Sequence, residues 1–184
     1  MSRRPFRIRS ICQPNNGMQR TALRAAADAR SVGRRGAGPL SDREFEGGCL
    51  CASTRFRVSE TAKSRCYCHC NSCRLAFGAP FVAWATFPTA EFRLIRGELA
   101  QYQSSEGVLR GFCASCGTGI TYRNQGRIDQ IDVAVATLDN PGSLQPEYHI
   151  WISHKLSWVT PGNQLPQFAE WRTSAVPRRL APKR

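Results

Sequence analysis

No stretch of this 184-residue sequence approaches the roughly 18 consecutive apolar residues that a transmembrane helix requires, so we expect no membrane-spanning segment. The positively charged N-terminus is not followed by the apolar run of about 7–15 residues that marks a secretory signal. We therefore expect a cytoplasmic protein in a reducing setting, where clustered cysteines are more often metal ligands than disulfides. The arginine-rich residues 1–40 would also suit a mitochondrial transit peptide, but the Gly-rich run at 34–39 has no helical periodicity and favours a basic extension.

Acidic residues are scarce at both ends of the chain, and this decides how the net charge of +13 is interpreted. Residues 1–41 hold nine arginines and one acidic residue, and residues 172–184 hold five basic residues and no acidic one. The part between them, 42–171, carries 12 basic and 12 acidic residues, so it has no net attraction for a phosphate backbone. We expect a folded domain over 44–171 that does not itself bind nucleic acid, with disordered basic tails at 1–43 and 172–184.

Sustained 3.6-residue periodicity is also missing, which argues against a helical domain. Instead, short β-rich segments alternate with Gly and Pro from residue 44 onward. They predict a mainly β domain of antiparallel sheets, with one helical turn at 71–76 and a last strand-like piece with a core role at 151–159. The expected strands lie at 54–58, 81–87, 92–95, 99–103, 108–112, 119–122, 130–138 and 148–152.

What the sequence has in excess is cysteine, with nine in all and eight of them in three clusters. A C-x-x-C pair lets two thiolates of one tight turn reach a tetrahedral metal, and a C-x-C pair can also chelate because residues i and i+2 of an extended strand face the same side. Gly117, directly after the third cluster, allows the left-handed backbone that such a turn needs. The clusters consist of Cys49 and Cys51; of Cys66, Cys68, Cys70 and Cys73; and of Cys113 and Cys116, whereas Cys12 lies alone.

The number of ligands favours two different metal sites. Structural zinc sites are closed by four ligands, which two of these short units can supply. The middle cluster has three closely spaced cysteines of its own, Cys68, Cys70 and Cys73, and three ligands leave a zinc ion with one open position, as in catalytic sites. Cys66 or His69 as a fourth ligand would instead make a second structural site. Disulfides would need an oxidising compartment and leave one cysteine over, and a thioredoxin-like role for the last pair lacks the surrounding βαβ pattern.

Several linked motifs resemble the glutathione-dependent formaldehyde-activating enzyme (Gfa) and centromere protein V domain family. They occur in the family's order over about residues 44–159, and the tails lie outside the resemblance. One departure is Ala52, which stands where the family usually has glycine. The motifs are GGCLC at 47–51, CHCNSCR at 68–74, GAPFVAW at 78–84, FCASCGT at 112–118, and His149, Trp151, Lys155 and Trp158.

The resemblance implies an Mss4-like, zinc-ribbon-containing β fold with two zinc ions per chain. It implies a carbon–sulfur lyase reaction, in which a small thiol such as glutathione and formaldehyde give S-hydroxymethylglutathione. The substrate thiol would bind at the open position of the catalytic zinc, which would deprotonate it and create the nucleophile. The alternative is a non-catalytic zinc-scaffolded module that binds protein or nucleic acid, with the basic tails supplying affinity for polyanions. The implied ligands are Cys49, Cys51, Cys113 and Cys116 for the structural zinc and Cys68, Cys70 and Cys73 for the catalytic one.

Other residues near the clusters have expected roles that can be checked against the structure. Arg74, one residue past the last ligand, is a candidate for neutralising the site or binding a carboxylate of the thiol, and the favoured alternative is a solvated or structural arginine. His69 lies between two ligands, so we expect its side chain to point away from the metal, as a structural or a proton-shuttling group. Aromatic residues near the clusters, Tyr67, Trp84, Trp151 and Trp158, are expected in the core.

Overall fold

The computed structural model describes residues 44–59 and 61–172. The basic tails predicted on either side lie outside the described residues, except for Arg172, and so does Cys12. Within the described residues the chain forms ten strands, five short 3-10 helices and one α-helix, α1 (Asn71–Phe77). The strands are β1 (Glu44–Gly48), β2 (Arg55–Ser59), β3 (Ser64–Cys68), β4 (Val82–Pro88), β5 (Arg93–Arg96), β6 (Ala100–Ser105), β7 (Val108–Phe112), β8 (Gly119–Asn124), β9 (Gln130–Ala134) and β10 (Tyr148–Ile150).

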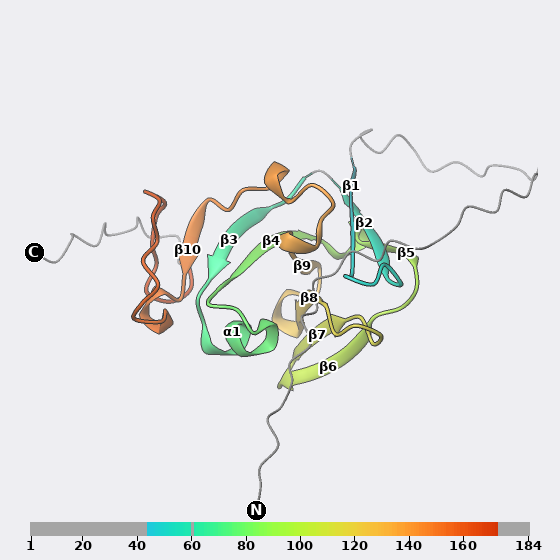
Figure 1. Cartoon of the computed structure of the whole chain (residues 1–184), viewed down its shortest axis with the longest axis horizontal. Helices are drawn as coiled ribbons and strands as arrows, with labels where there is room; N and C mark the ends of the chain where they lie inside the picture. The colour runs from blue at the N-terminus through green and yellow to red at the C-terminus, as the bar shows by residue number, and fades with distance from the viewer. Residues whose placement is uncertain (1–43, 60, 173–184) are drawn as a thin grey trace, which may run out of the picture. The chain divides into compact units, whose positions relative to one another are not determined.

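The strands form a small sheet and a large one, which confirms the predicted mainly β fold (Figure 1). The small sheet has the order β1-β2-β5, and the large one has the order β10-β3-β4-β9-β8-β7-β6. Every pairing is antiparallel except that of β10 with β3, which is parallel. The parallel pair departs from the predicted antiparallel sheets. It arises because the chain passes from β9 through η3 (Val135–Thr137) and η4 (Pro141–Ser143) into β10, which then runs beside β3 in the same direction.

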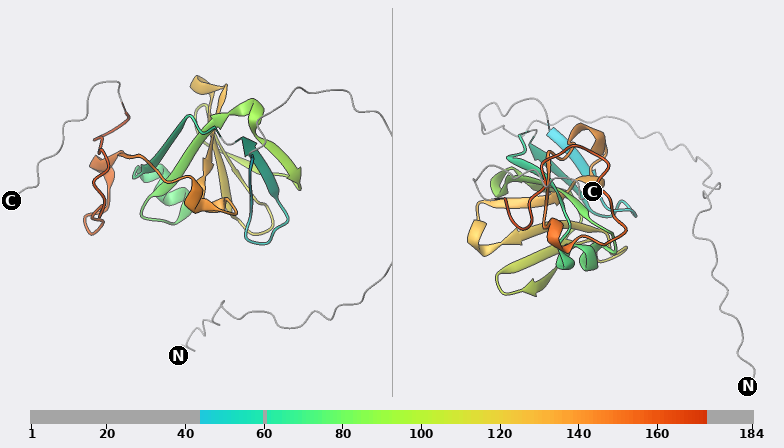
Figure 2. Two further views of the ribbon diagram at one scale, coloured as in Figure 1. Left: turned by 90° about the horizontal axis from the view of Figure 1, so that it is seen from above. Right: turned by 90° about the vertical axis from the view of Figure 1, so that its left-hand side faces the viewer.

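The hydrophobic core lies where the small sheet packs on the middle of the large one (Figures 1 and 2). Phe56 and Val58 of β2 are fully buried against Phe87 of β4 and Val133 of β9. Because successive side chains of a strand face opposite sides, β4 buries its other face in a second cluster that contains Trp84. The small sheet therefore covers one face of the large sheet, and Cys66 and Cys68 of β3 lie on the other face.

Several boundaries differ from the sequence prediction. β9 ends at Ala134, four residues short of the predicted strand, and continues as the 3-10 helix η3. Residues 151–159 form no strand, because Trp151 adopts a left-handed backbone with φ 58° and the 3-10 helix η5 (Ile152–His154) follows. Trp158 is 70% exposed and so lies outside the core, contrary to expectation. The remaining 3-10 helices are η1 (Thr89–Glu91) and η2 (Gln125–Arg127), and no helix of the described residues is long and apolar enough to cross a bilayer.

Candidate metal centre and active site

The first and third cysteine clusters meet although they lie far apart in the sequence. The four sulfurs of Cys49, Cys51, Cys113 and Cys116 all lie within 4.8 Å of one another. The Sγ atoms of Cys49 and Cys51 are 3.5 Å apart, and those of Cys51 and Cys113 are 3.8 Å apart. Four sulfurs at about 2.3 Å from one zinc ion would be about 3.8 Å apart, so the group fits a tetrahedral zinc.

Both turns of this four-sulfur group use a residue with a left-handed backbone. Gly117 has φ 76°, and its N–H donates to the Cys113 carbonyl at 2.8 Å, as the sequence predicts. Ala52 does the same at φ 60°, where its N–H donates to the Cys49 carbonyl at 2.9 Å. A Cβ in this region costs about 1–2 kcal/mol, so the backbone at Ala52 is strained.

Local hydrogen bonds favour the ionised form of two sulfurs in this group. Burial opposes ionisation of Cys49, but the Thr54 N–H at 3.2 Å and the Ser53 hydroxyl outweigh it and lower its pKa to about 7. The Ser53 hydroxyl, 3.2 Å from the sulfur, also lowers the pKa of Cys113 to about 5. Since the thiolate is the form that binds metal, the surroundings of the group suit a closed structural site.

The second group gathers three sulfurs at the junction of β3 and α1. Cys68 ends β3, Cys70 is the N-cap of the helix, and Cys73 lies in its first turn. Their sulfurs lie within 4.8 Å of one another, with Cys68 and Cys70 at 3.5 Å, and these spacings fit three corners of a zinc tetrahedron. The hydrogen bond between these two sulfurs lowers the pKa of Cys70 and raises that of Cys68. We call these three residues the sulfur trio.

Neither of the two residues considered as a fourth ligand belongs to the trio in the described part of the chain. Cys66 lies two residues earlier on β3, where burial raises the pKa of its thiol to about 12. The His69 ring is fully buried, and its Nε2 atom lies 2.9 Å from Nδ1 of His149. His149 in turn reaches the Asn163 side-chain oxygen through Nε2 at 2.9 Å. His69 therefore takes part in a buried hydrogen-bonded chain, and the trio keeps a side without a protein ligand.

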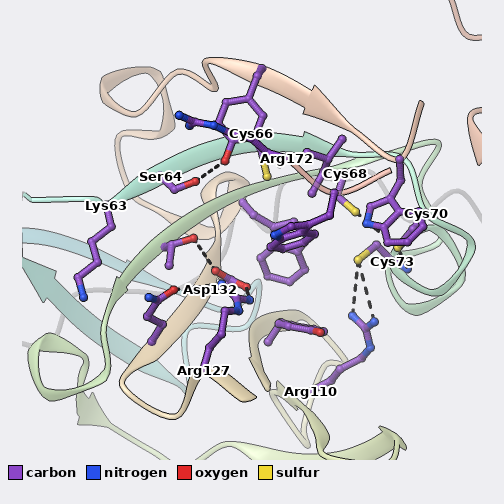
Figure 3. A pocket seen from close by; sticks show the side chains of 18 residues that line it. Lys63, Ser64, Cys66, Cys68, Cys70, Cys73, Arg110, Arg127, Asp132 and Arg172 are labelled. Carbon is purple, nitrogen blue, oxygen red and sulfur yellow. Dashed lines mark hydrogen bonds and ion pairs between the residues drawn. The ribbon is translucent and has the colours of Figure 1, made fainter. Parts of the chain in front are cut away.

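A cavity of about 350 Å³ opens on the trio, on the face of the large sheet opposite the small one (Figure 3). The register of the strands explains which side chains of the large sheet line the cavity. One cross-strand row consists of Tyr148 on β10, Cys66 on β3 and Trp84 on β4. A second row, two residues along the strands, begins with Ser64 on β3 and Thr86 on β4. That row continues through Asp132 and Tyr122 to Arg110. Trp151, Trp171 and Arg172 complete the lining together with Lys63, Arg127, Gln130 and Ile150.

The cation beside the trio is Arg110, not Arg74. Two guanidinium nitrogens of Arg110 lie 3.9 and 4.0 Å from the Cys73 sulfur, and the side chain is buried (Figure 3). The guanidinium also stacks over the Tyr122 ring at 5.1 Å, and Nε donates to the Ser104 hydroxyl at 3.0 Å. Arg74 instead donates to the His69 carbonyl and to the Asn71 side chain, which makes it a structural residue of α1.

The aromatic residues expected in the core have different places. Tyr67 stacks on His149 at 4.9 Å, on the far side of β3 from the cavity, but it is only partly buried and belongs to neither core cluster. Trp84 and Trp151 line the cavity, and Trp84 is 5% exposed. Trp84 belongs to the second core cluster and Trp151 packs against it, as expected, and both also form apolar walls around the approach to the sulfurs.

Comparison with known proteins agrees with this arrangement. The profile of a family described as "Glutathione-dependent formaldehyde-activating enzyme" matches residues 44–154, which is more than half of the chain. A search of curated proteins gave no match. Among solved structures, a crystal structure of a Rhodobacter sphaeroides protein aligns with a TM-score of 0.44 and 22% identity, over 66% of this chain and 98% of that one. From the profile match, the chain belongs to the glutathione-dependent formaldehyde-activating enzyme family.

Proposed function

We propose that this protein is a zinc-dependent carbon–sulfur lyase that acts on a small thiol such as glutathione and an aldehyde such as formaldehyde. The observation that carries the proposal is the position of the sulfur trio, at one end of a cavity and with one side free of protein ligands. Three ligands and an accessible fourth position are typical of catalytic zinc. Cys68, Cys70 and Cys73 would hold this ion, and the four-sulfur group would hold a second, structural zinc.

A zinc ion held by the trio would supply a positive centre at which the substrate thiol ionises near neutral pH. The thiol sulfur then attacks the aldehyde carbon, so that one C–S bond forms and the carbonyl π bond breaks. The proton lost by the thiol ends on the aldehyde oxygen, which becomes the hydroxyl of the hydroxymethyl product. Atoms and charge balance without any oxidant or reductant.

The residues of the chain have three tasks in this reaction. Three thiolates and one divalent zinc ion would carry a net charge of −1, and the guanidinium of Arg110 offsets this charge. Trp84, Trp151 and Tyr122 form a largely apolar wall that limits the water around the reacting sulfur. The four-sulfur group joins the β1–β2 turn to the β7–β8 turn and so holds the sheets in place.

We further propose that residues 44–171 act as one zinc-binding domain in a reducing compartment such as the cytoplasm, with 1–43 and 172–184 as basic extensions. Unpaired thiols support this setting, because the eight cysteines of the described residues form no disulfide. The competing function is a zinc-scaffolded binding module, in which the basic tails provide the affinity for polyanions.

The decisive experiment measures exchange between ¹³C-formaldehyde and its glutathione adduct by NMR, and compares the rate with that of a protein-free sample. We expect the wild-type protein to accelerate exchange and Cys70→Ser to abolish the acceleration while it remains folded. Arg93→Gln is the matched control, because Arg93 lies on β5, is exposed and does not line the cavity. A wild-type protein that carries two zinc ions but leaves the exchange rate unchanged would favour the binding module.

A further inference from the structure

The segment 166–172, which we call the C-terminal segment, is anchored beside β10 (Figure 2). The His149 N–H donates to the Pro166 carbonyl at 2.8 Å, and the Trp151 N–H donates to the Glu170 carbonyl at 2.9 Å. Between them the Phe168 N–H donates to the His149 carbonyl at 2.9 Å. The family match ends at residue 154, so whatever this segment adds to the cavity is additional to the matched region.

The C-terminal segment brings Trp171 and Arg172 to the cavity. The Arg172 guanidinium lies over the Tyr148 ring at 5.0 Å, and the Tyr148 hydroxyl is 2.5 Å from that of Ser64. The Trp171 ring is covered by the guanidinium of Arg127 at 5.3 Å. These contacts place both residues at the end of the cavity near Ser64, whereas the sulfur trio lies at the other end of β3.

The charges at this outer end are predominantly positive. Arg127 is offset by Asp132 at 2.8 Å, and Lys63 lies 3.7 Å from the exposed Asp129. No carboxylate of the described residues pairs with the Arg172 guanidinium, which lies over the Tyr148 ring, so among these residues it has no anionic partner to give up. A planar guanidinium binds carboxylates through two parallel hydrogen bonds, which suits recognition of that group.

The length of β3 sets the size of a ligand that could reach both ends. From Ser64 to Cys68 the strand rises about 13 Å, and from Cys66, which is paired with Tyr148, to Cys68 it rises about 7 Å. A ligand must therefore extend roughly 7–13 Å from its sulfur, the reach of about two to four extended peptide residues. Thiols of two or three carbons are too short to occupy both ends.

We propose that Trp171 and Arg172 form an outer anion subsite, which binds a carboxylate of the thiol substrate while its sulfur lies at the trio. The inference rests on the proposed function for the sulfur end, but the subsite itself is a property of the C-terminal segment. It makes Arg172 a specificity-determining residue that favours extended, carboxylate-bearing thiols over short or neutral ones.

The test uses the full-length, zinc-loaded protein and isothermal titration calorimetry. S-methylglutathione keeps both carboxylates but cannot donate a thiolate, so it probes the outer end alone. We expect it to bind the wild-type protein about twofold to fivefold more tightly than Arg172→Gln, since one exposed charged contact is involved. The diethyl ester of S-methylglutathione should bind both proteins equally weakly, and Arg93→Gln should behave like the wild type. Equal affinity of S-methylglutathione for the wild type and Arg172→Gln would overturn the subsite.

A second titration separates this inference from the proposed function. Cobalt replaces zinc, and glutathione or 2-mercaptoethanol is added while the sulfur-to-cobalt absorption band is followed. We expect Arg172→Gln to weaken the response to glutathione and to leave that to 2-mercaptoethanol unchanged. If no thiol alters the band, the proposed function fails, while the S-methylglutathione result still decides the subsite. If both thiols respond equally in both proteins, the subsite is wrong and the proposed function stands.

Discussion

Arg110 is the cation beside the sulfur trio, a position for which the sequence offers Arg74 only as a candidate. Its guanidinium nitrogens lie 3.9 and 4.0 Å from the Cys73 sulfur, and no acidic residue of the described chain pairs with it. At about 4 Å and an effective dielectric constant near 20, a cation attracts a unit negative charge by about 4 kcal/mol. Arg110→Gln removes this attraction but lets water approach, so the measured loss must be smaller.

We expect Arg110→Gln to weaken zinc binding at the trio by about 10–100-fold, the usual effect of losing a residue that supports the ligands. This corresponds to about 1.4–2.8 kcal/mol. Zinc at the four-sulfur group should keep its affinity, because that group lies outside the contacts of Arg110. Arg110→Lys should recover part of the loss, since it restores the charge without the planar guanidinium.

The assay is competition with a chromogenic chelator, which removes the two zinc ions in separate steps. The more tightly held ion serves as an internal reference for folding, and circular dichroism confirms that the variant keeps its sheets. Arg74→Gln is the matched control, since Arg74 follows a ligand in the sequence but bonds only to α1 and its flanking backbone. Unchanged affinity in Arg110→Gln, or an equal loss at both sites, would refute the electrostatic reasoning.

Three further predictions test other parts of the structure. Cys113→Ser should unfold the domain, because a structural zinc contributes on the order of 10 kcal/mol to the free energy of folding. Cys70→Ser should remain folded. Equal loss of circular dichroism in both variants would contradict the assignment of one structural and one catalytic site. Ala52→Gly should raise the free energy of unfolding by up to about 1 kcal/mol in urea titrations, since it relieves a left-handed backbone at φ 60°, and a loss of stability would contradict the strain. Burial lowers the pKa of His149 below its ordinary 6.5, so below that pH the unfolded chain binds more protons than the folded one. The free energy of unfolding should therefore decline from pH about 6.5 downward at fixed free zinc, and less steeply in His149→Gln. Equal slopes in the two proteins would count against a buried neutral ring.

Much of the fold could be predicted because local patterns carry it. The strand at β4 is a continuous apolar run ended by Pro88, and β7 was predicted with the observed bounds. β1 and β3 were missed because their sequences, EFEGG and SRCYC, contain polar residues and no β-branched ones. β3 is stabilised by a partner distant in sequence, since its Cys66 pairs with Tyr148 of β10. β1 is stabilised by its neighbour β2, for example through the ion pair between Arg57 and Glu46 at 2.5 Å.

In the candidate site, too, the residues close together in sequence could be predicted and the distant one could not. The spacing of Cys68, Cys70 and Cys73 predicted a group that the structure does assemble, because all three lie on one short segment. Arg110 could not be assigned to it, since it lies 37 residues from Cys73 and meets it only in the folded protein. The one available signal was an arginine within the otherwise apolar strand VLRGF, where burial of a charge requires a partner.

Sequence separation also sets the order in which the two sulfur groups can capture metal. The four-sulfur group closes a loop between Cys51 and Cys113, which are 62 positions apart, and a cross-link of that span restricts the unfolded chain by about 4 kcal/mol. The trio spans only six residues and needs no such closure, so a nascent chain can chelate an ion there before either sheet exists. If both groups hold zinc as proposed, the structural ion is the last to be acquired when metal is scarce. Synthesis of folded protein should then depend more steeply on zinc supply than does the lifetime of protein already assembled.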